Sequence, residues 1–97
     1  MVLSSFYIFG STTTLPDAQI ANNPTEIDRL FDTAETLYKQ KKYDEAIRYY
    51  DKILALNSIE IDALNDKGVV LGELQKYDEA LPYFDQFYLL MHQMFMQ

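Results

Sequence analysis

The 97-residue sequence contains no cysteine and only one histidine. The missing cysteine excludes disulfide bonds, thiolate metal sites and cysteine nucleophiles, although it does not fix a cellular compartment. The single histidine, His92, has no second histidine or cysteine near it in the sequence to share a metal ion, and no nucleophile with a histidine base stands out. The acids are spread along the chain and form no reactive pair. We therefore expect a protein without enzymatic activity, metal or cofactor.

Basic residues are also scarce. Eight Lys and Arg residues stand against fifteen Asp and Glu residues, which gives a formal net charge of −7 at pH 7. Nucleic acid is not an expected partner, because its phosphates would be repelled. Basic or neutral peptides and protein surfaces remain open as partners. Apolar residues make up 48% of the chain and charged residues 24%, which is ordinary for one small globular domain.

The sequence also lacks an apolar run near the roughly 20 residues that a membrane-spanning helix needs. The first ten residues, "MVLSSFYIFG", are apolar and resemble the core of a signal peptide, but no Lys or Arg precedes them. We expect residues 1–23 to form an N-terminal arm that is poorly ordered or packed back on the domain. The expected location is cytoplasmic, with export left open by this stretch.

What the chain does contain is an internal repeat. The phrase "KYDEA" begins at residue 42 and again at residue 76, which is 34 positions later. When residues 27–60 are laid over residues 61–94 without gaps, 13 positions are identical, among them Asp32 with Asp66. A period of 34 residues points to stacked helical hairpins.

Within each copy, apolar residues recur at spacings of three and four, as on one face of a helix. This spacing predicts an all-α fold with helices near 25–40, 44–56, 61–74 and 78–94. Asn23 is the expected N-cap of the first helix, with Pro24 as its first residue and Glu26 as the carboxylate three positions after the cap. Asn57 and Ser58 are the expected turn formers between the two hairpins.

These patterns resemble the tetratricopeptide repeat (TPR) family. The first copy carries the family's large, small, large, tyrosine, alanine and aromatic positions as Leu30, Ala34, Leu37, Tyr43, Ala46 and Tyr50. The second copy carries them as Leu64, Gly68, Leu71, Tyr77, Ala80 and Phe84. The resemblance implies a two-repeat α-solenoid over residues 24–97, with repeat 1 at 27–60 and repeat 2 at 61–94. It also indicates that Gly68 and Gly72 of "GVVLG" serve close helix packing, since this segment lacks the GxGxxG phosphate fingerprint.

The resemblance further implies that the first helix of each hairpin lines a concave groove in which partner peptides lie. The expected groove residues are Asp28, Phe31, Asp32, Glu35, Tyr38, Asp62, Asn65, Asp66, Val69 and Glu73. This acidic wall favours a basic or neutral segment, with Phe31 and Tyr38 as apolar anchors. Phe31, Glu35 and Asp66 stand where carboxylate-binding members carry Lys or Asn, so that mode is not expected. The alternative is that these acids only keep a helix face solvated.

The C-terminal stretch is the remaining anomaly, because residues 86–97, "QFYLLMHQMFMQ", hold no Asp, Glu, Lys or Arg. A helix through this stretch is apolar nearly all round and needs cover. We expect a second copy to cover it, through Phe87, Leu90, Met91, Met94 and Phe95. The alternatives are cover by the N-terminal arm and a chain that is a shortened piece of a longer repeat array. The competing function is therefore a structural or self-association module.

Overall fold

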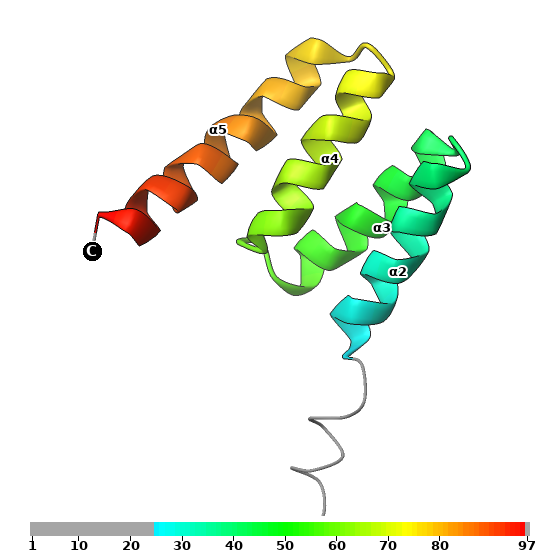
Figure 1. Ribbon diagram of the computed structural model, residues 1–97, viewed down its shortest axis with the longest axis horizontal. Helices are drawn as coiled ribbons and strands as arrows, with labels where there is room; N and C mark the ends of the chain where they lie inside the picture. Colours follow the sequence, from blue (N-terminus) through cyan, green and yellow to red (C-terminus); the bar gives the residue numbers. More distant parts are fainter. Residues whose placement is uncertain (1–24, 97) are drawn as a thin grey trace, which may run out of the picture.

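The computed structural model describes residues 25–96, and the expected N-terminal arm lies outside them. Four helices follow one another as two antiparallel hairpins (Figure 1). They are α2 (Glu26–Lys39), α3 (Tyr43–Leu56), α4 (Ile61–Glu73) and α5 (Tyr77–Phe95). Helix α2 packs on α3, α3 packs on α4, and α4 packs on α5. The predicted all-α fold of tandem helical hairpins is confirmed.

The start of α2 differs from the predicted cap. The helix begins at Glu26, and Thr25 is its N-cap. The Thr25 hydroxyl accepts a hydrogen bond from the Asp28 backbone N–H at 3.1 Å, and the Asp28 carboxylate accepts one from the Thr25 N–H at 3.0 Å. This reciprocal capping box satisfies two backbone donors that the helix leaves free. The expectation of Asn23 as the cap, with Glu26 as the carboxylate three residues after it, is wrong, because the cap is Thr25 and the carboxylate that bonds back to it is that of Asp28.

Both hairpin turns are built in the same way. Lys41 and Gln75, which are 34 residues apart, adopt left-handed backbone angles with φ of 64° and 62°. In the first turn the N–H groups of Lys41 and Lys42 donate to the carbonyls of Tyr38 and Leu37, at 2.8 and 2.9 Å. This Schellman pattern closes the end of α2. The second turn repeats it at the end of α4. The sequence "KYDEA" therefore follows a helix stop in each repeat.

The core lies where the two helices of each hairpin cross. Its buried apolar residues are Leu30, Ala34, Ala46, Tyr50, Ile53, Ala63, Leu64, Val70, Leu71 and Ala80. Gly68 is buried as well, and a Cβ added there would lie 2.9 Å from two ring atoms of Phe84. The close packing predicted for Gly68 is therefore present. The same prediction for Gly72 is wrong, because a Cβ there would meet nothing within 4 Å.

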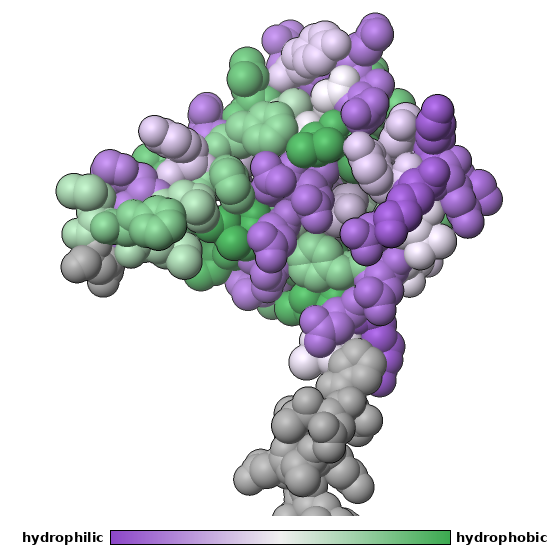
Figure 2. All heavy atoms as spheres, viewed as in Figure 1, coloured by the Kyte–Doolittle hydropathy of each residue, from purple (hydrophilic) through white to green (hydrophobic). Residues whose placement is uncertain are grey.

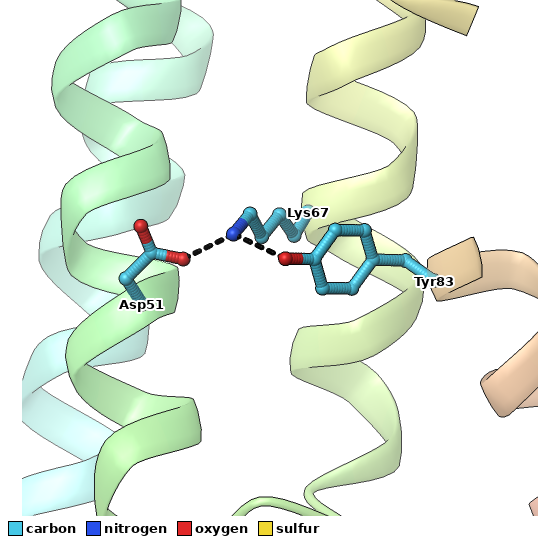
Figure 3. A network of polar contacts seen from close by, with 3 residues as sticks. All are labelled: Asp51, Lys67 and Tyr83. Atoms are coloured by element: carbon cyan, nitrogen blue, oxygen red, sulfur yellow. Dashed lines mark hydrogen bonds and ion pairs between the residues drawn. The ribbon is translucent and has the colours of Figure 1, made fainter. Parts of the chain in front are cut away.

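The two hairpins are joined by a short turn and by a polar network. In the turn, the Asn57 side chain accepts a hydrogen bond from the Ile59 N–H at 3.2 Å, in keeping with its predicted turn role. The ammonium of Lys67 on α4 donates to the carboxylate of Asp51 on α3 and, at 2.7 Å, to the hydroxyl of Tyr83 on α5 (Figure 3). The Lys67 side chain is only 13% exposed. One side chain thus links three helices across both repeats.

Helix α5 is six residues longer than α4, with 19 residues against 13. It includes Pro82, which lies inside the helix. Because proline has no backbone N–H, the backbone carbonyl four residues before it receives no helical hydrogen bond from this position. Figure 2 shows apolar surface gathered toward the end of the molecule formed by α5, and hydrophilic surface over α2. Within residues 25–96, no helix combines the length and hydropathy needed to cross a membrane.

Two leucines among the apolar residues that recur along the helices lie outside the packed faces in the structure. Leu56 on α3 is 59% exposed and Leu81 on α5 is 58% exposed. Leu56 is the last residue of α3, where the chain turns away before α4 begins. Leu81 follows the buried Ala80 directly, so it points to a different side of α5.

Candidate peptide-binding groove

A small pocket lies between the first helices of the two hairpins. Its volume is about 150 Å³, and its lining comes from α2, α3 and α4. The lining residues are Glu35, Tyr38, Tyr50, Asp66, Val69 and Val70, and we call this set the acid pocket. Four of the six belong to the groove set predicted from the sequence. The pocket is smaller than the roughly 300–1,000 Å³ of typical small-molecule sites, so it suits a single side chain.

Tyr50 and Val70 form the floor of the acid pocket. They are 3% and 1% exposed, whereas Glu35 and Val69 at its edge are exposed. Phe31 on α2 packs against the Tyr50 ring edge to face, with the ring centroids 6.3 Å apart and an interplanar angle of 65°. This geometry is favourable for aromatic pairs. Phe31 therefore supports Tyr50 and does not line the pocket itself, and its use as an apolar anchor for a partner segment stays a prediction.

The hydroxyl of Tyr50 has an unusual environment. Among the hydrogen bonds within residues 25–96, none involves this hydroxyl. In the same part of the chain, no fully buried side-chain polar atom lacks a partner. The Tyr50 oxygen must therefore reach solvent, and the space that Tyr50 lines is the acid pocket. Burial and the charges of Asp66 and Glu35 raise the pKa of Tyr50 to about 12, so it is a neutral phenol at physiological pH.

Asp66 is the most perturbed acid of the pocket. Burial raises its pKa, and the carboxylates of Asp62 and Glu35 raise it further, while a hydrogen bond with Asn65 opposes the shift. Asp62 lies one helical turn before Asp66 on α4, a spacing at which like charges repel. Carboxylates from α2 and α4 therefore lie close together at a partly buried place in the acid pocket. A cation placed there would relieve the repulsion.

Tyr38 is a second tyrosine that lines the acid pocket. Burial raises its pKa, followed by the charge of Glu73 on α4 and the neighbouring Tyr43. The Tyr38 and Tyr43 rings lie 5.6 Å apart, tilted by 50°. Tyr43 therefore packs beside the first hairpin turn, whereas its counterpart Tyr77 is 61% exposed.

The other predicted groove residues lie around the acid pocket without lining it. Asp28 is engaged in the capping box at the start of α2. Asp32 and Asp62 are exposed one turn before Glu35 and Asp66, and Glu73 is exposed near the end of α4. Asn65 is partly buried beside Asp66.

The five residues predicted for self-association divide into two groups on α5. Phe87, Met91 and Phe95 line a second pocket, together with Tyr88 and His92. Leu90 lines a third, on the side of α5 that faces the turn between α3 and α4. Phe87, Leu90 and Met91 are partly buried. Met94 and Phe95 are 63% and 77% exposed, beyond the reach of α4.

Comparison with known protein families gives two matches, both described as tetratricopeptide repeat. One covers residues 27–58 and the other residues 61–90. The chain belongs to the tetratricopeptide repeat family. Comparison with curated proteins and with solved structures gave no significant match. The two family matches begin at residues 27 and 61, where the two copies of the internal repeat also begin.

TPR repeats mediate protein–protein interactions and are typically non-catalytic. This agrees with the expectation of an interaction protein drawn from the repeat. In the second repeat Phe84 replaces the tyrosine at position 50 of the first. An aromatic ring fills this packing position in both repeats. Because Phe84 fills it without a hydroxyl, packing does not require the hydroxyl of Tyr50.

Sequence reasoning missed Tyr50 and Val70 because it assigned the groove to the first helix of each hairpin and apolar residues to the core. Tyr50 lies on α3, the second helix of its hairpin, yet its side chain lines the acid pocket together with residues of α2 and α4. The signal that could have found it is the tyrosine-to-phenylalanine difference between the two repeats. Lys67 was also missed, because its counterpart in the first repeat is Thr33, which makes no such link.

Proposed function

We propose that this chain binds a basic or neutral segment of a partner protein in the groove between α2 and α4. The observation that carries the proposal is the acid pocket, where Glu35 and Asp66 bring two carboxylates beside tyrosine rings. The rings offer apolar contact, and the carboxylates favour positive charge. The formal net charge of −7 acts in the same direction over a longer range.

A peptide array tests this function. Peptides of equal length and matched apolar content, but basic, neutral or acidic, are probed with the full chain at low and at physiological salt. We expect basic and neutral peptides to bind better than acidic ones, with the advantage of basic peptides reduced by salt. Equal binding of basic and acidic peptides would contradict the proposal.

Charge reversal then locates the binding surface. Asp32→Lys and Asp66→Lys should each weaken binding of the selected peptides, with circular dichroism confirming that the helices remain. The matched control is Asp85→Lys, which reverses an exposed acid on α5 and does not touch the acid pocket. If the control weakens binding as much as the groove variants, the effect is general electrostatics and the groove is not the site.

The second candidate function is self-association through α5, and the internal repeat supports it. Ile53 on α3 is completely buried in the core cluster that includes Ala63 and Val70 of α4. Its counterpart on α5 is Phe87, which is partly exposed, and the next residue, Tyr88, is 73% exposed. The face that α3 buries under α4 is therefore repeated on α5, and among residues 25–96 no further helix covers it.

Light scattering or sedimentation over a range of protein concentrations tests this second function. We expect a dimer, and we expect the variant Met94→Lys/Phe95→Lys to be monomeric with unchanged helix content, because both side chains are exposed in one copy. The variant Leu56→Lys removes an equally exposed apolar residue from α3 and should still dimerise. A monomeric wild type at tens of micromolar would rule out self-association as a function of α5.

A further inference from the structure

The acid pocket has a composition that goes beyond a negative surface. Its acceptors are the carboxylates of Glu35 on α2 and Asp66 on α4 and the phenol oxygen of Tyr50 on α3, so they come from three helices. Tyr50 is 3% exposed, and its hydroxyl makes no hydrogen bond within the described residues. Because this hydroxyl has no protein partner within the described residues and reaches solvent through the pocket, it is available to accept a hydrogen bond from a ligand that displaces water there.

The size of the pocket limits what that ligand is. A volume of about 150 Å³ admits a side chain of several heavy atoms and no large cofactor. Val69 and Val70 offer apolar contact, and the pocket is also lined by Tyr38 and Tyr50, whose aromatic rings are of a kind that attracts cations. No group of three or more acidic, histidine or cysteine side chains in residues 25–96 is close enough to hold a metal ion. An organic cation with an apolar stem fits these walls.

Among organic cations, the arrangement of acceptors favours an ammonium group. A lysine ammonium is a compact charge with three rotatable donors, which matches three acceptors approaching from three helices. An arginine guanidinium is planar and forms its strongest contacts as a two-pronged fork on a single carboxylate. The apolar stem of lysine, four methylenes long, would lie along Val69 and the tyrosine rings.

We propose that the acid pocket is a socket for one lysine side chain of the partner segment, with Asp66, Glu35 and the Tyr50 hydroxyl as the three acceptors of its ammonium. This inference rests on the proposed groove function and specifies how the groove selects its ligand. The raised pKa of Asp66 supports it, because burial and then repulsion from Asp62 and Glu35 disfavour the charge of this carboxylate, and a positive neighbour would offset both. The absence of a hydroxyl at Phe84 supports it too, because the fold does not require one at that position.

The test uses a small probe that does not depend on the rest of a partner. Nα-acetyl-lysine N-methylamide is titrated into the isotope-labelled full chain and followed by NMR, beside the norleucine and arginine analogues. We expect the lysine probe to shift the resonances of the acid pocket and to bind at least about tenfold more tightly than norleucine, which has a similar shape without the charge. Binding of the arginine probe as tight as that of lysine would overturn the assignment.

Variants separate the socket from diffuse charge. Asp66→Asn and Tyr50→Phe should each weaken binding of the lysine probe about tenfold or more, since the first removes the negative charge that faces the ammonium and the second removes an accepting oxygen. The matched control is Asp85→Asn, which deletes the same charge from an exposed site on α5 that does not line the pocket. We expect less than about a twofold effect at this solvated position. Equal losses in Asp85→Asn and Asp66→Asn would overturn the socket.

The two proposals can fail separately. If basic peptides bind on the array but the lysine probe shifts no pocket resonance, the socket is wrong and the groove function stands. If the probe shifts the pocket resonances but no peptide binds, the preference of the acid pocket for an ammonium stands, and the groove function is wrong.

Discussion

Gly68 and Gly72 offer a test of the packing that holds the second hairpin together. They lie one turn apart on α4, and replacing either by alanine removes the same conformational cost of glycine in a helix, about 0.5–1 kcal/mol. They differ in what the added methyl group meets. At position 72 it meets nothing within 4 Å, whereas at position 68 it would lie 2.9 Å from Cε1 and Cζ of Phe84 and 3.1 Å from Cε2.

The expected magnitudes follow from this difference. Carbon atoms pack best at about 3.5–4.0 Å, so the Phe84 ring or the helix must move by several tenths of an ångström or more. Overpacking of this kind costs about 1–3 kcal/mol. After subtracting the gain in helix propensity, we expect Gly68→Ala to be about 1 kcal/mol less stable than wild type. Gly72→Ala should be about 0.5–1 kcal/mol more stable.

Thermal and urea unfolding followed by circular dichroism measures both variants. A difference of about 2 kcal/mol corresponds to roughly 10 °C in midpoint temperature for a domain of this size. The double variant Gly68→Ala/Phe84→Leu identifies the cause, because leucine lacks the three ring atoms that the new methyl group would meet. In the Phe84→Leu background, Gly68→Ala should become stabilising. If Gly68→Ala is as stable as Gly72→Ala with Phe84 in place, the close contact does not limit the packing and the reasoning is refuted.

Three further predictions concern the turns, the polar network and pH. Lys41→Gly and Gln75→Gly should each stabilise the fold by about 0.5–1 kcal/mol in urea unfolding, because a side chain at left-handed φ is strained; a destabilised variant would contradict the turn geometry. Lys67→Met should lose about 1 kcal/mol, and a double-mutant cycle with Asp51→Asn should show coupling; independent effects would exclude the link. Burial and then Asp62 raise the pKa of Asp66 above its usual 3.8, so the native state holds this proton more tightly than the unfolded state does. The stabilisation that this bound proton gives to the folded state is fully present below pH 3.8, and it is lost as pH rises through the raised pKa of folded Asp66. Asp66→Asn should therefore exceed wild type in stability at pH 7, and the gap should close in acid; a constant gap would contradict this assignment.

Most of the fold could be predicted from the repeat alone. A 34-residue period with thirteen identities fixes four helices, and each observed boundary lies within one residue of its predicted place. The N-cap was missed because several polar residues precede α2 and only three-dimensional structure shows which pair bonds reciprocally. Gly72 was misjudged because a pattern of small residues does not reveal whether the facing helix is near.

The candidate groove could be predicted in outline only. Family resemblance identified the helices that form its walls, and Glu35, Tyr38, Asp66 and Val69 line the pocket found there. It could not identify the floor, because the role of Tyr50 depends on where the side chain of α3 emerges between α2 and α4. The charge crowding at Asp66 also depends on partial burial, which a net charge of −7 does not reveal.

The opposite signs predicted for Asp66→Asn in stability and in binding distinguish a recognition residue from a structural one. A carboxylate that serves packing is paired in the folded protein, so its removal lowers stability. Asp66 has the reverse character, since burial and the neighbouring carboxylates disfavour its charge in the free protein. A positive side chain in the acid pocket would lower that electrostatic cost at the moment of binding. A variant that is more stable alone and weaker toward lysine is therefore the outcome that a binding role for Asp66 requires, and a purely solvating acid would change neither quantity.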